Sequence, residues 1–110
     1  MVVTLSVQQL ADLLGAQDLD LIDVRDESEW SSGHLPGARS LTIEQLRADP
    51  DQALPRRDGI IFVCAKGVRS LTAAKLADRL GYTTVYSLDG GTNAWAQAGH
   101  QLVVERRAAA

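Results

Sequence analysis

Cys64 is the only cysteine of the chain, and it ends an apolar run in the segment IIFVCAKGVRS (60–70). A cysteine attacks as the thiolate, whose pKa of about 8.5 falls beside cations and helix N-termini. The run at 60–64 predicts a buried strand, with a helix beginning about five residues later. Ligands bind at this carboxyl edge of open α/β sheets. We therefore predict that Cys64 is a nucleophile; the alternative is a small apolar residue that closes a strand.

The segment after the cysteine is predicted to form an anion-binding loop. Its backbone N–H groups can turn toward one centre, and Gly67 supplies the backbone freedom that a tight turn needs. The following helix adds its positive N-terminal end. Lys66 is interpreted as a cation that attracts an anionic substrate, against the alternative of a solvated surface charge. The predicted binding residues are Ala65, Lys66, Gly67, Val68, Arg69 and Ser70.

The elements that must position this loop follow from hydrophobic patterning. Strands are predicted at 19–24, 38–41, 60–64 and 83–88. Helices are predicted at 7–14, 27–30, 43–48 and 69–80, with a last short helix after the glycine turn within 88–99, and 49–59 is predicted to be a polar connection. About five strands interleaved with about five helices indicate an α/β fold. The expected architecture is a three-layer sandwich, an about five-stranded parallel sheet with helices on both faces.

Length and charge narrow the classes of function. The 110 residues predict one domain, 1–110, with a core at about 6–99 and a frayed tail at 105–110. A net charge of −3 argues against nucleic acid as a partner. No apolar run approaches the ~20 residues of a membrane span, and no signal peptide is evident. One cysteine without metal-ligand spacing predicts no metal site and a reducing compartment, the cytoplasm.

Three segments resemble the signature segments of the rhodanese family, in the same order. They are LIDVRDESEWSSGHLPGA (21–38), CAKGVRS (64–70) and LDGGTNAWAQAG (88–99). The resemblance implies a single-domain rhodanese, a thiosulfate sulfurtransferase without a cofactor that carries sulfur as a persulfide of Cys64. It implies thiosulfate or a similar anion as donor, and cyanide, a small thiol or a protein thiol as acceptor. The basic loop favours thiosulfate over mercaptopyruvate as donor.

Two alternatives to this enzyme follow from the same residues. Phosphatases that share the fold place five residues between cysteine and arginine, whereas four separate Cys64 from Arg69. The shorter loop encloses a smaller cradle, which favours sulfur over phosphate. The second alternative is a sulfur-relay or regulatory module that passes persulfide sulfur to one partner protein.

The resemblance also places supporting residues beside the loop. Asp23 and Arg25 are expected at the same sheet edge, with Arg25 paired to a nearby glutamate such as Glu29. His34 lies in a predicted turn and is interpreted as structural. Packing roles are expected for Trp30 and Trp95, and Gly90 and Gly91 are expected to bring a tight turn toward the rim of the site.

Overall fold

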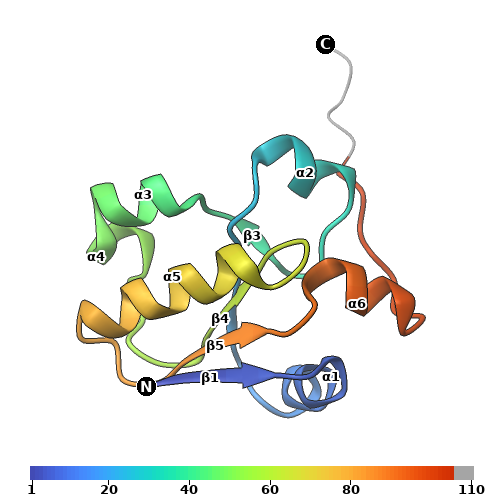
Figure 1. Ribbon diagram of the computed structural model, residues 1–110, viewed down its shortest axis with the longest axis horizontal. Helices are drawn as coiled ribbons and strands as arrows, with labels where there is room; N and C mark the ends of the chain where they lie inside the picture. Colours follow the sequence, from blue (N-terminus) through green and yellow to red (C-terminus); the bar gives the residue numbers. More distant parts are fainter. Residues whose placement is uncertain (106–110) are drawn as a thin grey trace.

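A computed structural model describes residues 1–105, which build one five-stranded parallel sheet in the order β1-β5-β4-β2-β3 (Figure 1). The strands are β1 (Val2–Leu5), β2 (Asp20–Asp23), β3 (Arg39–Ser40), β4 (Ile60–Val63) and β5 (Val85–Leu88). The helices are α1 (Val7–Ala16), α2 (Glu27–Ser32), α3 (Ile43–Ala48), α4 (Pro50–Ala53), α5 (Val68–Arg79) and α6 (Gly91–Gln97). The predicted five-stranded parallel sheet with helices is confirmed.

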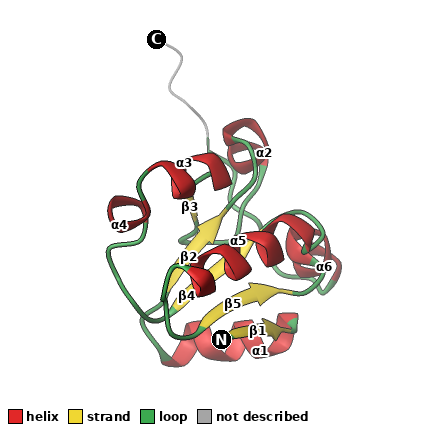
Figure 2. Ribbon diagram, turned by 60° about the vertical axis from the view of Figure 1, so that its left-hand side comes forward, coloured by secondary structure: helices red, strands yellow, loops and turns green. Residues whose placement is uncertain are grey.

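Two apolar clusters cover the two faces of the sheet. Successive residues of the central strand β4 alternate between them: Ile60 and Phe62 join one cluster, and Ile61 and Val63 join the other. The first cluster packs under α3, α4 and α5, and the second packs against α1 and α6. Figure 2 shows α5 on one side of the strands and α1 on the other. All four β4 residues are buried, as expected for a strand covered on both faces.

Two details of the predicted organisation were wrong or incomplete. Only four strands were located from the sequence, and the fifth is β1, which pairs in parallel with β5 from Val2 opposite Val85 to Leu5 opposite Leu88. The segment 49–59 is not wholly irregular, because its first residues form α4. Asp49 caps that helix by accepting a hydrogen bond from the Gln52 amide, and a proline occupies the first turn.

The last described residues pair with the end of α2 and the segment that follows it. Val103 forms an isolated antiparallel bridge with His34, and the Glu105 amide bonds to the Ser31 carbonyl. The predicted frayed tail falls, beyond Glu105, outside the described residues. Within residues 1–105, no helix has both the length and the apolar character that crossing a bilayer requires.

Candidate active site

Cys64 lies where β4 ends, on the face of the sheet that packs against α5. The residue is 1% exposed and stands at the bottom of a hollow of about 250 Å³. The hollow is lined by Cys64, Ala65, Lys66, Val68 and Arg69. The strand is therefore a rigid mount, and the sulfur faces a small space bounded by the predicted loop.

Hydrogen-bond donors of the loop converge on the cysteine sulfur. The amides of Gly67 and Ser70 donate to Sγ over 3.1 and 3.3 Å, and the Ser70 hydroxyl lies 3.5 Å from it. Burial raises the pKa of the Cys64 thiol. The Ser70 hydroxyl and the amides of Ser70, Gly67 and Lys66 outweigh burial, so the net pKa lies below its ordinary value. The arrangement stabilises a thiolate.

The loop takes this shape because Gly67 adopts a left-handed conformation, with φ of 98°. A Cβ there would approach the Gly90 nitrogen to 3.2 Å and the Leu88 carbonyl oxygen to 3.3 Å. Among residues 1–105, the Val68 and Arg69 amides have no backbone acceptor, because they belong to the first turn of α5. These amides remain available to an anion.

The start of α6 clamps the loop from the side of β5. The Thr92 amide donates to the Cys64 carbonyl over 2.8 Å, and the Asn93 amide donates to the Ala65 carbonyl over 3.1 Å. At Gly91, with φ of 58°, a Cβ would stand 2.1 Å from the Cys64 carbonyl oxygen. Only glycine permits this approach. The glycine turn therefore reaches the rim of the site, as the sequence predicted.

Arg69 is held by a carboxylate from another element. Its Nη1 and Nη2 lie 2.9 and 3.1 Å from the two carboxylate oxygens of Glu29 on α2, a bidentate pair. This hydrogen bonding is the main reason that the Glu29 pKa falls from 4.5 to about 2. The guanidinium is thus fixed beside the hollow with its charge partly neutralised.

The expected pairing of Arg25 with Glu29 is wrong. Arg25 instead bonds Asp23, with Nε 3.0 and 3.1 Å from the two carboxylate oxygens and Nη2 2.7 Å from Oδ2. Its Nη2 also donates to the Gly33 carbonyl over 2.6 Å. Both side chains are buried, at 8% and 0% exposure. Asp23 and Arg25 are only two residues apart, and their side chains meet. Through its bond to Gly33, Arg25 also connects the end of β2 to the end of α2.

The family model of the rhodanese-like domain matches residues 6–98. The chain belongs to the rhodanese-like domain family. It is 37% identical over 99 residues to the thiosulfate sulfurtransferase GlpE of Shewanella oneidensis, covering 86% of this chain and 92% of that protein. It is 34% identical over 105 residues to GlpE of Pseudoalteromonas translucida, covering 93% and 95%.

Solved rhodanese-like structures have the same fold. A rhodanese-related protein of Thermoplasma volcanium superposes with a TM-score of 0.80 at 26% identity, covering 93% of this chain and 98% of that one. A Rhodopseudomonas palustris protein described as a possible tyrosine phosphatase gives a TM-score of 0.79 at 33% identity, covering 93% and 85%. The fold alone therefore does not separate sulfur from phosphate chemistry.

Two parts of this rhodanese-like site were missed from the sequence. Ser87 of β5 is buried and lies 2.8 Å, oxygen to oxygen, from the Ser70 hydroxyl that faces the sulfur. Glu29 was assigned to the wrong arginine. A small polar residue inside an apolar strand was the available signal for Ser87, because buried hydroxyls require partners.

His34 has the structural setting that was expected. Its ring stacks on Trp30 at 4.2 Å between centroids, and Nδ1 lies 2.8 Å from the Trp30 carbonyl oxygen. Trp30 in turn donates from Nε1 to the Ala38 carbonyl. Among residues 1–105, no three His, Cys, Asp or Glu side chains are grouped so as to hold a metal ion.

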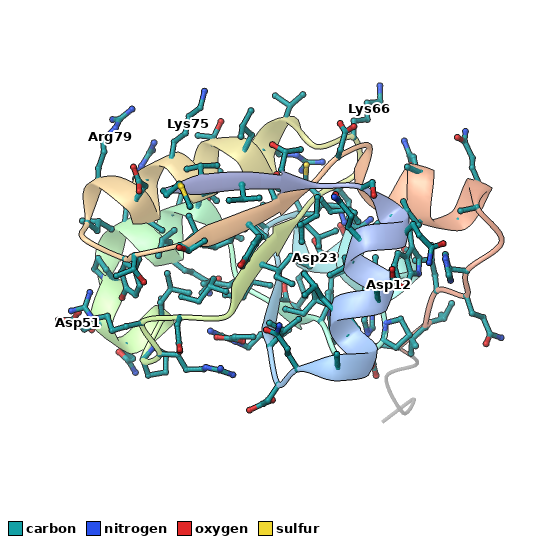
Figure 3. All side chains as sticks on the ribbon, turned by 90° about the horizontal axis from the view of Figure 1, so that it is seen from below. Asp12, Asp23, Asp51, Lys66, Lys75 and Arg79 are labelled. Carbon is teal, nitrogen blue, oxygen red and sulfur yellow. The ribbon has the colours of Figure 1, made fainter. Side chains whose placement is uncertain are left out.

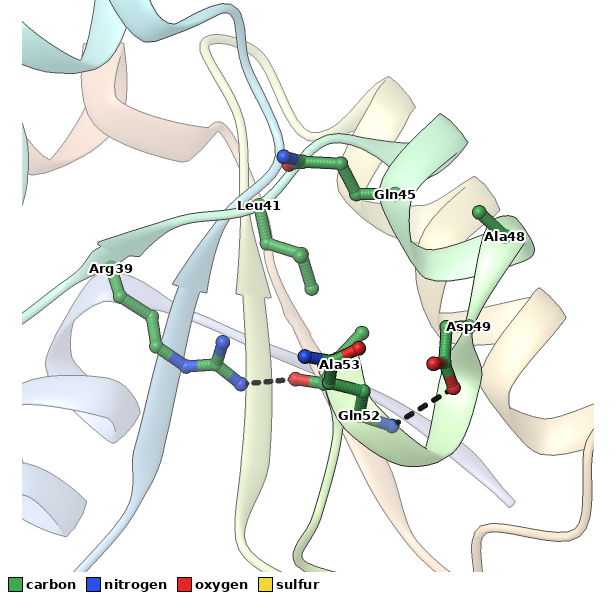
Figure 4. A pocket seen from close by; sticks show the side chains of 7 residues that line it. All are labelled: Arg39, Leu41, Gln45, Ala48, Asp49, Gln52 and Ala53. Carbon is green, nitrogen blue, oxygen red and sulfur yellow. Dashed lines mark hydrogen bonds between the residues drawn. The ribbon is translucent and has the colours of Figure 1, made fainter.

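A larger hollow of about 390 Å³ lies away from the cysteine, beside β3, α3 and α4 (Figure 4). Its one cation is Arg39, which bonds the Asp20 carboxylate through two nitrogens at 2.9 Å and donates to the Ala53 carbonyl. The Asp49 carboxylate caps α4. Arg39 and Asp49 of this larger hollow thus already have partners, whereas the smaller hollow combines the Cys64 thiol with the Val68 and Arg69 amides.

Proposed function

We propose that this rhodanese-like domain, folded as one unit over the chain, is a thiosulfate sulfurtransferase that works through a persulfide of Cys64. The observation that carries the proposal is the convergence of the Gly67 and Ser70 amides on Sγ. Thiosulfate sulfurtransferase is also what its GlpE relatives are named. The need for a reduced thiol makes the cytoplasm the proposed location.

The first half-reaction moves one sulfur atom to the enzyme. The Cys64 thiolate attacks the outer sulfur of thiosulfate, the S–S bond of thiosulfate breaks, and sulfite leaves with its electron pair. Charge is conserved in this step, because a thiolate anion and a thiosulfate dianion become a persulfide anion and a sulfite dianion. The outer sulfur lies in the small hollow of about 250 Å³ above Cys64. There the Val68 and Arg69 amides stabilise its negative charge, as an oxyanion hole stabilises an anionic oxygen.

The second half-reaction returns the thiolate. Cyanide or a thiol attacks the outer sulfur, and the electron pair of the broken S–S bond stays on Cys64, giving ping-pong kinetics. No second cysteine exists in the chain, so the sulfur must leave to another molecule. Exposed Lys66 at the mouth of the hollow attracts the thiosulfate dianion, and Asp23 and Arg25 support the strand end.

Mass spectrometry tests the covalent step directly. Incubation with thiosulfate is expected to add one sulfur atom to wild type and none to Cys64→Ser. Lys66→Ala is the matched control: it keeps the thiol, forms the persulfide, and requires more thiosulfate. No added sulfur in wild type, or full cyanide-dependent turnover in Cys64→Ser, would contradict the mechanism. Hydrolysis of p-nitrophenyl phosphate at rates above that of Cys64→Ser would favour the phosphatase alternative instead.

A relay module is the second candidate, and the same single cysteine favours it. A persulfide that cannot be resolved within the chain suits delivery to one partner. Rapid transfer to a protein thiol together with a high KM for cyanide would favour the relay. Fast turnover with cyanide and no preference for protein thiols would favour the enzyme.

A further inference from the structure

The exposed side of α5 and the loop before it form a cationic strip, which we define as Lys66, Val68, Thr72, Lys75 and Arg79. All five side chains are exposed. The last four recur at helical spacings of four, three and four residues, so they share one face of α5. Figure 3 shows Lys66, Lys75 and Arg79 projecting on the same side of the molecule, away from the labelled aspartates.

The cations of this strip stand out because the chain as a whole is acidic, with a net charge of −3. Residues 66–79 hold four of its eleven Lys and Arg and a single carboxylate. That carboxylate, Asp78, binds the N-terminal ammonium. The charge of Arg69 is paired with that of Glu29. Within residues 1–105, no ion pair engages Lys66, Lys75 or Arg79, and their charges face solvent.

The strip is continuous with the mouth of the site. Lys66 and Val68 line the hollow above Cys64. Farther along α5, a second hollow of about 210 Å³ is lined by Arg47, Thr72, Lys75, Leu76 and Arg79. At a rise of about 1.5 Å per residue, Lys75 and Arg79 lie roughly 10 and 16 Å along the helix from Val68. Val68 is 72% exposed, which gives the strip an apolar contact beside the reactive sulfur.

We propose that this strip docks the sulfur acceptor, and that the acceptor is a protein thiol followed by acidic residues. The inference rests on the proposed persulfide of Cys64. The acceptor thiol attacks the outer sulfur, a new S–S bond forms, and the bond to Cys64 breaks. Cys64–S–S⁻ and R–SH give Cys64–S⁻ and R–S–SH, with no net oxidation. Charge complementarity with Lys75, Arg79 and neighbouring Arg47 selects the acidic partner and speeds encounter.

The spacing defines a peptide test. An extended chain covers about 3.3 Å per residue, so 10 to 16 Å corresponds to roughly three to five residues beyond the acceptor cysteine. Persulfidated protein is mixed with a peptide that carries one cysteine and glutamates at those positions. A second peptide carries lysines at the same positions, and 2-mercaptoethanol serves as an uncharged acceptor. The measured quantity is the second-order rate constant for loss of the persulfide, at low and high salt.

The acidic peptide is expected to react faster than the lysine peptide, with an advantage that shrinks as salt rises. Lys75→Glu/Arg79→Glu is expected to lower its rate constant roughly five- to thirty-fold, because two favourable charge contacts become repulsive. The rate with 2-mercaptoethanol is expected to stay unchanged. Arg56→Glu/Arg57→Glu is the control for net charge: it makes the same charge change in the loop before β4, where both arginines pair with aspartates, and is expected to leave both rates unchanged.

Three results would overturn the docking proposal: equal rates for both peptides, an acidic preference that persists in Lys75→Glu/Arg79→Glu, or an equal loss in the control variant. A single-stranded RNA that binds the strip and blocks the acidic peptide at far lower concentration would assign the strip to nucleic acid instead. Each of these results presupposes a persulfide that forms and discharges to 2-mercaptoethanol. If no persulfide forms at all, the proposed function itself fails.

Discussion

Among residues 1–105, Ser70 is the one residue whose side chain hydrogen-bonds the cysteine sulfur, and Ser70→Ala removes that hydroxyl. The Ser70 hydroxyl lies 3.5 Å from Sγ and 2.8 Å from the Ser87 hydroxyl oxygen. The substitution leaves the backbone of α5 and both loop amides in place. Its effect on the sulfur therefore reports the contribution of a single hydroxyl to the thiolate.

The magnitude follows from the hydrogen bonds whose distances to the sulfur are given above, from the Gly67 and Ser70 amides and the Ser70 hydroxyl. Hydrogen bonds to charged groups contribute about 1.5–3 kcal/mol, and this one is the longest of the three. A loss of about 1.4 kcal/mol of thiolate stabilisation raises the pKa of Cys64 and shifts the equilibrium about tenfold toward the thiol. The thiolate fraction at neutral pH then falls by up to about tenfold, while reactivity at high pH, where the thiol is fully ionised, changes little.

Ser70→Ala also leaves the Ser87 hydroxyl buried without that partner, which costs about 1–3 kcal/mol of unfolding free energy. A second variant separates this cost from the pKa. In Ser70→Ala/Ser87→Ala the orphaned hydroxyl is gone, so stability is expected to recover while the raised pKa of Cys64 remains. Ser87→Ala alone keeps the Ser70 hydroxyl and is expected to move the pKa less.

The assay is the rate of iodoacetamide alkylation of Cys64 as a function of pH, whose inflection gives the thiol pKa. Urea unfolding at neutral pH measures stability for each variant. The expected result is an inflection at a higher pH than in wild type for both variants that lack the Ser70 hydroxyl. An inflection that coincides with wild type in Ser70→Ala would refute the reasoning, since the hydroxyl would then contribute nothing to the thiolate.

Three further substitutions test the supports of the loop. Glu29→Gln is expected to cost only about 1 kcal/mol at neutral pH, because the partly exposed pair with Arg69 is screened. Because the pKa of Glu29 is lowered from 4.5 to about 2, the difference in unfolding free energy between wild type and Glu29→Gln should be complete above pH 4.5 and disappear toward pH 2. A difference in urea stability that does not change with pH would contradict this prediction. Gly91→Ala forces a Cβ toward the Cys64 carbonyl and should lower kcat at least about tenfold, with near-normal kcat as the contrary result. Arg25→Ala strands a buried carboxylate and should lower unfolding free energy by about 3–5 kcal/mol; a loss below 1 kcal/mol by urea denaturation would disagree.

Much of the fold is readable in the sequence because its signals are local. Ser6 and Thr42 cap their helices reciprocally with Gln9 and Gln45, as capping boxes. The uninterrupted apolar run of β4 indicates burial on both faces. By contrast, β1 lacks such a signal: it is an edge strand of four residues, and its place is set by pairing with β5 at the far end of the chain.

The partners of the charged residues illustrate what lies beyond local pattern. Arg25 and Arg69 are each within reach of more than one carboxylate in a sequence-based picture. The assignment of Asp23 to Arg25 and of Glu29 to Arg69 depends on how α2 sits above the strand ends. The attraction between two charges depends on their distance in space and not on their separation in the sequence. The tertiary packing therefore decides which arginine meets which carboxylate.

By itself, the sequence determined the local frame of the candidate site: one cysteine after a buried strand, a glycine that permits a left-handed turn, and a helix that follows. These are properties of residues adjacent in the chain, and adjacency fixes their geometry. The tertiary structure alone decided what surrounds that site. The Ser87 hydroxyl on β5 and the α6 amides that bond the loop carbonyls come from elements distant in sequence. Their relation to the sulfur exists only once the sheet order β5-β4-β2 has set them side by side.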